Sequence, residues 1–162
     1  MHRSASFLRR IRFPRGVSLL VVAFIAATGL RAAERPQARW ESVVAWTFDQ
    51  PGDRRGWQPN ADLTNVVVAD GAMQCRAVGA DPILELQAPL SFAAEPWQAF
   101  EVRLKADHDG VAELFWSNTA EGRFGGFSQE KSTRFPVTGD GRWATYRVLP
   151  GWHNEGRIVR LR

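Results

Sequence analysis

The chain's seven tryptophans, all between Trp40 and Trp152, most constrain what it can fold into. They lie in short segments, such as residues 46–49 and 143–148, in which large rings alternate with smaller or polar side chains. Gly, Pro and Asp separate these segments. Aromatic and β-branched residues that recur with a period of two fit the pleated, half-buried surface of a strand. The pattern therefore predicts an all-β domain.

The strands expected from this alternation are short and closely spaced. They comprise residues 43–49, 63–69, 72–78, 83–88, 100–105, 111–116, 133–137, 143–149 and 157–162. Asp-Gly pairs at 70–71, 109–110 and 140–141 are turn signals, the first of them a hairpin signal. No segment has the period of an amphipathic helix. This pattern is typical of an antiparallel β-sandwich or a barrel, and we favour a jelly-roll sandwich.

Residues 1–33 have the order of a secretory signal peptide. Basic residues come first, residues 17–30 are almost wholly apolar, and the small residues Ala32 and Ala33 follow. The apolar run is short for a membrane span, so we expect cleavage between about Leu30 and Arg35. An uncleaved N-terminal anchor is the alternative. The sequence thus predicts a leader at 1–33, a linker at 34–42 and one domain at 43–162.

The net charge changes once the leader is removed. Residues 1–33 contain six arginines and no acidic residue, so 15 basic and 17 acidic side chains remain and the net charge is −2. No Lys/Arg cluster remains that could neutralise a phosphate backbone, which argues against nucleic-acid binding. We expect a secreted or periplasmic protein without a transmembrane segment in its mature chain.

The sequence offers little for metal binding or redox chemistry. Cys75 is the single cysteine, so no internal disulfide is possible, and its alternation with apolar neighbours predicts a buried, inert thiol. His108 and His153 have no second His or Cys at ligand spacing. Asp49 and Asp53 could supply some oxygen ligands to Ca²⁺, but Asp in turns more often accepts local backbone hydrogen bonds. We therefore expect no metal and no cofactor.

A series of short motifs covers nearly all of the expected domain. They are Trp-Thr-Phe-Asp at 46–49, Gly-Trp at 56–57, Val-Ala-Asp-Gly at 68–71, Asp-Pro-Ile-Leu at 81–84, Phe-Glu-Val-Arg-Leu-Lys at 100–105, Glu-Leu-Phe-Trp at 113–116, Asp-Gly-Arg-Trp at 140–143 and Gly-Arg-Ile-Val-Arg-Leu-Arg at 156–162. Their order resembles the galactose-binding-like β-sandwich domains of exported bacterial proteins, the superfamily of many carbohydrate-binding modules. The resemblance implies a jelly-roll fold and carbohydrate binding, although members of this superfamily also bind lipids or proteins.

One set of residues suits a sugar ligand. Aromatic rings stack on the C–H faces of sugars, while Arg, Glu and Asn bind the hydroxyl groups in the plane of the sugar ring. Residues 117–132 form the longest turn-like stretch, and long loops at the rim of a rigid domain often meet ligands. The candidate binding residues are Trp116, Arg103, Arg134, Arg160, Phe124 and Phe127. Alternatively, Trp116 is a core ring, as we expect of Trp46 and Trp143, and the arginines are simply solvated.

Catalysis has weaker support in the sequence. Glycoside hydrolysis needs two carboxylates roughly 5–10 Å apart, and only Glu101 and Glu113 could face each other on neighbouring strands. A cross-strand ion pair of Glu113 with Arg103 is the simpler interpretation. A lyase would need a Tyr or His base, but the only tyrosine, Tyr146, alternates with Val148 and is expected to point inward. We therefore expect no catalytic residues and no enzyme.

The sequence leads to three ranked hypotheses. The first is a secreted, non-catalytic domain that binds a polysaccharide or glycan. The second is a structural or protein-interaction domain of the cell envelope, and the third is a small glycan-active hydrolase or lyase. The chain stops at Arg162 inside an expected strand. We therefore expect either the end of the gene or a fragment of a larger exported protein, with a sandwich truncated at its C-terminal edge.

Overall fold

The structure, a computed structural model, describes residues 5–12 and 39–162. Strands dominate this part of the chain. They are β1 (Ala5–Arg12), β2 (Arg39–Thr47), β3 (Trp57–Pro59), β4 (Leu63–Ala69), β5 (Ala72–Ala77), β6 (Leu84–Leu86), β7 (Phe92–Ala93), β8 (Gln98–Leu104), β9 (Gly110–Ser117), β10 (Ser132–Val137), β11 (Ala144–Val148), β12 (Arg157–Ile158) and β13 (Arg160–Leu161). Three short 3₁₀ turns are η1 (Arg123–Gly126), η2 (Gln129–Lys131) and η3 (Trp152–Glu155). No helix in these residues has the length and hydropathy needed to cross a bilayer.

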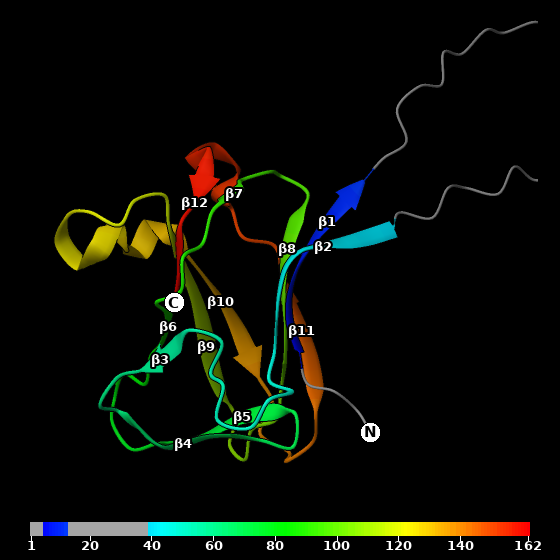
Figure 1. The fold of residues 1–162 in the computed structure, drawn as a ribbon, viewed down its shortest axis with the longest axis vertical. Coiled ribbons are helices and arrows are strands. Elements are labelled where there is room, and N and C mark those ends of the chain that lie inside the picture. Colours follow the sequence, from blue (N-terminus) through cyan, green and yellow to red (C-terminus); the bar gives the residue numbers. More distant parts are fainter. Residues whose placement is uncertain (1–4, 13–38) are drawn as a thin grey trace, which may run out of the picture.

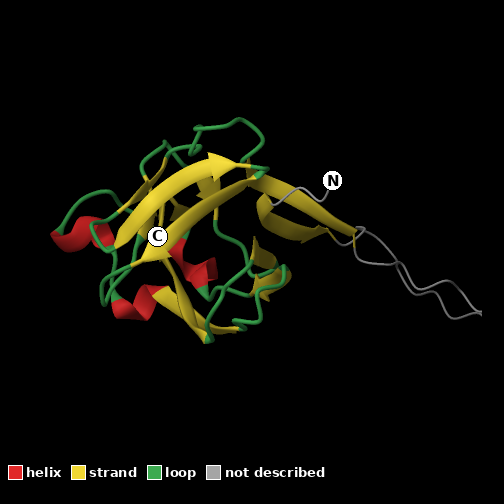
Figure 2. Ribbon diagram, turned by 90° about the horizontal axis from the view of Figure 1, so that it is seen from below, coloured by secondary structure: helices red, strands yellow, loops and turns green. Residues whose placement is uncertain are grey.

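Two main sheets organise the domain. One has the strand order β11-β8-β1-β2 and the other the order β10-β9-β13, while β4-β5, β3-β6 and β12-β7 form two-stranded ribbons. Every strand pairing among the described residues is antiparallel. Figure 1 shows β9 and β10 on one side of the molecule and β8, β1, β2 and β11 on the other; in Figure 2 strands and loops make up most of the domain, and helix is confined to short turns. The predicted all-β, antiparallel class is confirmed, with sheets that are small and unclosed.

A single aromatic-rich core lies between these elements. Its buried members are Trp46, Phe48, Trp57, Val68, Leu86, Phe92, Phe100, Leu114, Trp116, Trp152, Ile158 and Leu161. Trp152 is completely buried, and its ring meets those of Phe92 and Trp116 edge to face at centroid distances of 5.5 and 5.9 Å. Its indole N–H donates to Gln98 Oε1 at 2.8 Å, so the polar atom of this ring is also satisfied. Both main sheets therefore contribute to one core.

The three Asp-Gly turns connect the strands in two different ways. Asp70 and Gly71 both have positive φ angles, 53° and 76°, and join β4 to β5 as the predicted hairpin. The turns at 109–110 and 140–141 instead carry the chain from one main sheet to the other, from β8 to β9 and from β10 to β11. These two crossings touch, because Gly139 N–H donates to Asp109 Oδ1 at 2.7 Å.

The N-terminal segment enters the sheet. Strand β1, inside the predicted leader, pairs along its length with β2 and on its other side with β8. Strand β2 begins at Arg39, so the end of the expected linker 34–42 is also part of a strand. The apolar run 17–30 and the expected cleavage region lie outside the described residues. Signal-peptide removal therefore stays a prediction. Such removal would take β1 out of its place between β2 and β8.

Two predicted burials are wrong. Cys75 is exposed, because the register of β4 and β5 shifts between Thr64 and Val67 and the inward alternation is lost past that point. Trp143 was expected in the core with Trp46, but 44% of its surface is exposed, since it precedes β11 at the end of a turn. Trp46 is buried as expected.

Candidate functional site

Four of the six predicted binding residues gather around the β10-β9-β13 sheet. Arg134 lies on β10 and Arg160 on β13, while Phe124 and Phe127 come from the loop between β9 and β10. Trp116 belongs to the same sheet, on β9, but points to its other side. Arg103 lies on β8 in the other main sheet. The structure therefore brings most of the six predicted binding residues into one region, but not all of them.

Trp116 is a core residue. Only 3% of its surface is exposed, and it packs edge to face on Trp152. Its neighbour two residues back, Leu114, is equally buried, while Glu113 and Phe115 on the alternate positions reach the opposite face of β9. A ring so enclosed has no free face on which a sugar could stack. The structure therefore favours the alternative that Trp116 fills the core.

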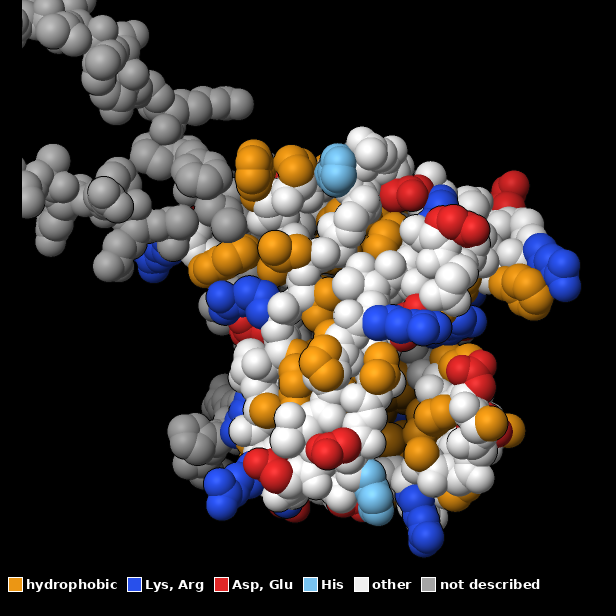
Figure 3. Space-filling view, turned by 180° about the vertical axis from the view of Figure 1, so that it is seen from behind, with side chains coloured by type: hydrophobic (Ala, Val, Ile, Leu, Met, Phe, Trp, Pro, Cys, Tyr) orange, Lys and Arg blue, Asp and Glu red, His pale blue; other side chains and the backbone are white. Residues whose placement is uncertain are grey.

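A hollow of about 300 Å³ opens on the outer face of this sheet. Its lining residues are Phe115, Phe124, Phe127, Ser128, Gln129 and Arg162. Phe127 is buried with 6% exposure and closes one side, whereas Phe124 stands at the rim with 67% exposure. In Figure 3, hydrophobic and basic side chains lie next to each other on the part that projects at the right edge. The hollow therefore combines apolar ring faces with hydrogen-bonding groups.

Arg160 holds the loop against the sheet. Its Nη1 donates to the carbonyl of Gly125 at 3.0 Å, its Nη2 pairs with Glu85 of β6, and its guanidinium lies 4.8 Å from the centre of the Phe127 ring. A Cβ at Gly125 would overlap the guanidinium, and the φ of this residue is +63°. Only glycine fits both the approach and the backbone. Arg160 therefore acts as a brace beneath the loop.

Phe124 has an unusual backbone for a bulky residue. Its φ and ψ angles are 56° and 23°, in the left-handed region, which such side chains rarely adopt. Conformations of this kind cost roughly 1–3 kcal/mol and persist where surrounding contacts enforce them. The ring gains little burial in return, since it is mostly exposed and lies 4.7 Å from the neighbouring Arg123 guanidinium. Core packing does not account for this arrangement.

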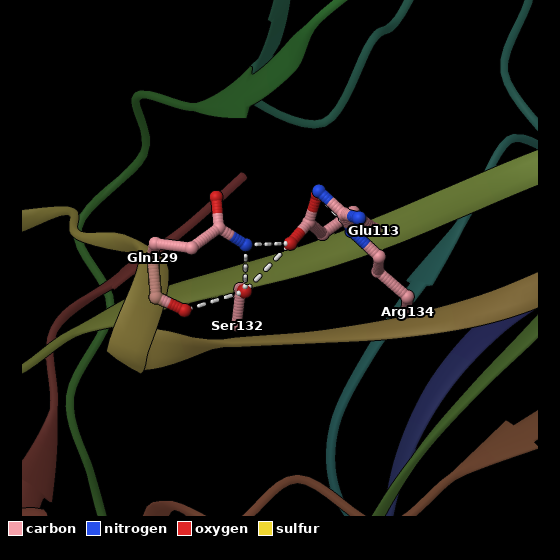
Figure 4. A network of polar contacts seen from close by, with 4 residues as sticks. All are labelled: Glu113, Gln129, Ser132 and Arg134. Carbon is pink, nitrogen blue, oxygen red and sulfur yellow. Dashed lines mark hydrogen bonds and ion pairs between the residues drawn. The ribbon is translucent and has the colours of Figure 1, made fainter.

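A polar network borders the hollow (Figure 4). Glu113 accepts hydrogen bonds from Ser132 Oγ at 2.6 Å and from Gln129, and it pairs with Arg134 Nε at 3.1 Å. Burial alone would raise the pKa of Glu113, but the hydrogen bonds from Ser132, Gln129 and Arg134 together lower it below its ordinary value of 4.5. Glu113 is thus an ionised acceptor that orients Gln129 and Arg134. Its partner is Arg134 and not Arg103 as expected.

On the other main sheet, the arginines contact tryptophan rings. Arg103 stacks on Trp143 at 4.8 Å, and Arg147 stacks on Trp40 at 4.8 Å while pairing with Glu101 at 2.6 Å. Glu101 and Glu113, considered as a possible carboxylate pair, lie on strands of different sheets, each held by its own arginine. The structure therefore does not bring the two carboxylates together.

Sequence reasoning missed four residues of the hollow. Phe115 and Arg162 face each other across β9 and the end of β13, where their backbones exchange hydrogen bonds of 2.8 and 3.0 Å. Ser128 and Gln129 belong to the loop and to η2. The alternation of Leu114 and Trp116 with Glu113 and Phe115 was a usable signal for Phe115. The pairing of β9 with β13 had no signal in the sequence.

Metal ligands do not cluster within residues 5–12 and 39–162: no group of three or more His, Cys, Asp or Glu side chains could hold an ion there. Asp53, considered for Ca²⁺, accepts hydrogen bonds from the backbone and side chain of Arg55 instead. Comparison with known proteins places the chain in no family, since no family model, no curated protein and no solved structure matches it.

Proposed function

We propose that this chain is an exported, non-catalytic domain of the galactose-binding-like β-sandwich type, which binds a carbohydrate in the hollow beside Phe124. The observation that carries the proposal is an exposed phenylalanine on a strained backbone, next to a ring-lined hollow with amide, hydroxyl and guanidinium groups. Sugars present apolar C–H faces and in-plane hydroxyls, which match these two kinds of groups. Exposed aromatic rings beside a few convergent polar groups are typical of ligand sites.

The polar groups suit hydroxyl recognition because they are already oriented. Gln129, which lines the hollow, is held by Glu113 and Ser132 through its amide nitrogen, and this leaves its amide oxygen as an acceptor. Groups held in this way lose little conformational freedom when a ligand binds. The hollow of about 300 Å³ is at the lower end of the range for small-molecule sites, which fits one or two sugar rings at the end or side of a longer glycan.

The carboxylates support binding over hydrolysis. A general acid for glycoside cleavage needs a raised pKa, whereas the pKa of Glu113 is lowered. Glu101 pairs with Arg147 on the other sheet and offers no partner for a two-carboxylate mechanism. The glycan-active enzyme is therefore the least supported of the three hypotheses.

A protein-interaction domain is the second candidate. Outside the hollow, Trp97, Val111 and Leu149 are exposed at 52%, 69% and 67%, and exposed large hydrophobic side chains are common where proteins associate. This function predicts self-association or capture of a partner that does not depend on Phe124.

A glycan array followed by calorimetry tests the first proposal. Phe124→Ala should abolish binding of any glycan that the array identifies, with the melting temperature unchanged, because the ring is mostly exposed. Trp143→Ala is the matched control: it also removes an exposed ring, but one on the other side of the domain, and it should retain binding. An array without hits, or equal affinity of the Phe124→Ala variant and the unaltered chain, would refute glycan binding in the hollow.

A further inference from the structure

The charges around the hollow are not all compensated. Arg134 is paired with Glu113, and Arg160 is paired with Glu85. Arg162 lines the hollow itself, and no Asp or Glu side chain of the described residues forms an ion pair with its guanidinium. The residues that line the hollow include no acidic side chain. Among the described side chains, this guanidinium therefore has no carboxylate partner at the hollow.

Two phenylalanines hold that guanidinium in place. Its Cζ lies 4.4 Å from the centre of the Phe115 ring and 5.1 Å from that of Phe127. The backbone of Arg162 is fixed as well, by hydrogen bonds with Phe115 in both directions. The rings offer no oxygen or nitrogen acceptor, and no described residue accepts a hydrogen bond from this guanidinium, so its N–H donors remain for other partners. Edge donors in a fixed fork match a carboxylate or a sulfate, which accept two parallel hydrogen bonds.

We infer that the hollow selects an acidic glycan, whose carboxylate or sulfate group pairs with Arg162 while a sugar ring rests against Phe124. This inference deepens the proposed function and rests on it. The predicted mature chain has a net charge of −2, so long-range attraction of a polyanion is absent and the selectivity comes from this local contact. Because this contact between opposite charges is open to solvent, salt screens it, and we expect the preference for acidic glycans to weaken as the salt concentration rises.

Calorimetry with two forms of one polymer tests the inference. The probes are polygalacturonate and its fully methyl-esterified form, which differ only in the charge of the carboxyl groups. The unaltered chain should bind the acid form at least about ten-fold more tightly, as expected of a charge-assisted bidentate contact. A sulfated galactan and its desulfated form make the second pair, and a preference confined to this pair would identify sulfate as the group bound.

Variants of Arg162 complete the test. Arg162→Gln should remove the preference for the acid form, and Arg162→Lys should restore part of it, with the melting temperatures showing that both variants fold. Arg157→Gln is the control, because it removes an exposed arginine of β12 that contacts Ser91 and does not line the hollow. It should leave the preference unchanged.

The outcomes separate the two proposals. Equal affinity for charged and neutral polymers, or a preference that survives Arg162→Gln, overturns the inference about charge. If binding of the neutral polymer is still lost in Phe124→Ala, glycan binding itself stands. Failure of all four polymers and of a neutral glycan array to bind overturns both.

Discussion

The outer faces of the two main sheets carry the same kinds of residues to different effect. On the β11-β8-β1-β2 sheet, arginines lie over the rings of Trp40 and Trp143, and Glu101 is buried beneath its ion pair with Arg147. On the β10-β9-β13 sheet, a loop held up by Arg160 leaves a hollow between the rings. Arginine, glutamate and aromatic rings are thus not enough for a site. The sheet with the hollow differs in having a loop that holds the aromatic rings apart.

The two sheets also differ in where their strands come from. All three strands of the β10-β9-β13 sheet lie within residues 110–161. The other sheet includes β1, which precedes residue 13 and lies in the predicted leader. Export with cleavage would thus alter one sheet and spare the one that carries the hollow. The following predictions test this contrast, beginning with the largest effect.

Replacing Trp116 should be the most damaging change in the hollow-bearing sheet. Trp116→Ala should lower the free energy of unfolding by about 3–5 kcal/mol, because it removes a buried ring from the core. Phe124→Ala, on the outer side, should change it by less than about 0.5 kcal/mol, as is usual for exposed positions. Urea denaturation measures both, and similar values for the two variants would contradict the division into a core face and an open face.

Removing residues 1–33 should loosen one sheet only. In a chain that begins at Glu34, the amides of β2 that face β1 lose their partners, and their hydrogen exchange should become about ten-fold faster or more, which corresponds to a local loss of about 1.4 kcal/mol. The amides of β9 and β10 should keep their protection. Unchanged exchange in β2 would mean that β2 finds another partner once the leader is absent.

The two carboxylate–arginine pairs should differ in strength. Glu101→Gln should cost about 1–3 kcal/mol, because its side chain is only 9% exposed and the charged partner of Arg147 would be lost from a site that water reaches poorly. Glu113→Gln should cost less than about 1 kcal/mol, since Arg134 is 65% exposed and water can replace the pair. Thermal unfolding of the two variants measures the difference, and a larger loss for Glu113→Gln would reverse our ranking.

The smallest effect concerns pH. The pKa of Glu113 is lower in the folded chain than its ordinary value of 4.5, so its ionised form stabilises the folded state above that value. This stabilisation is lost as the pH falls below 4.5 and through the lowered pKa. The melting temperatures of the unaltered chain and of Glu113→Gln should therefore converge in acid. A difference that stays constant, or that grows with acidity, would show that the pKa is not lowered.

How much of this was predictable can be judged from particular elements. Strand β4 has the bounds predicted from its apolar run, and β10 differs from its prediction by one residue. The short strands β3 and β7 were missed, because two or three residues show no alternation. Cys75 was misjudged because a register shift breaks the alternation that the prediction relied on. Local pattern was reliable only where a strand is long and regular.

The sequence by itself determined the all-β class, most of the strands and the inward faces of Trp46 and Phe48, because side-chain alternation is a local property of the chain. Only the tertiary structure decided which strands share a sheet. It put Arg103 on one side of the domain and Arg160 on the other, buried Trp116, and brought Phe115 beside Arg162. Strand pairing depends on contacts between distant segments, which no local period encodes. The hollow is a product of that pairing.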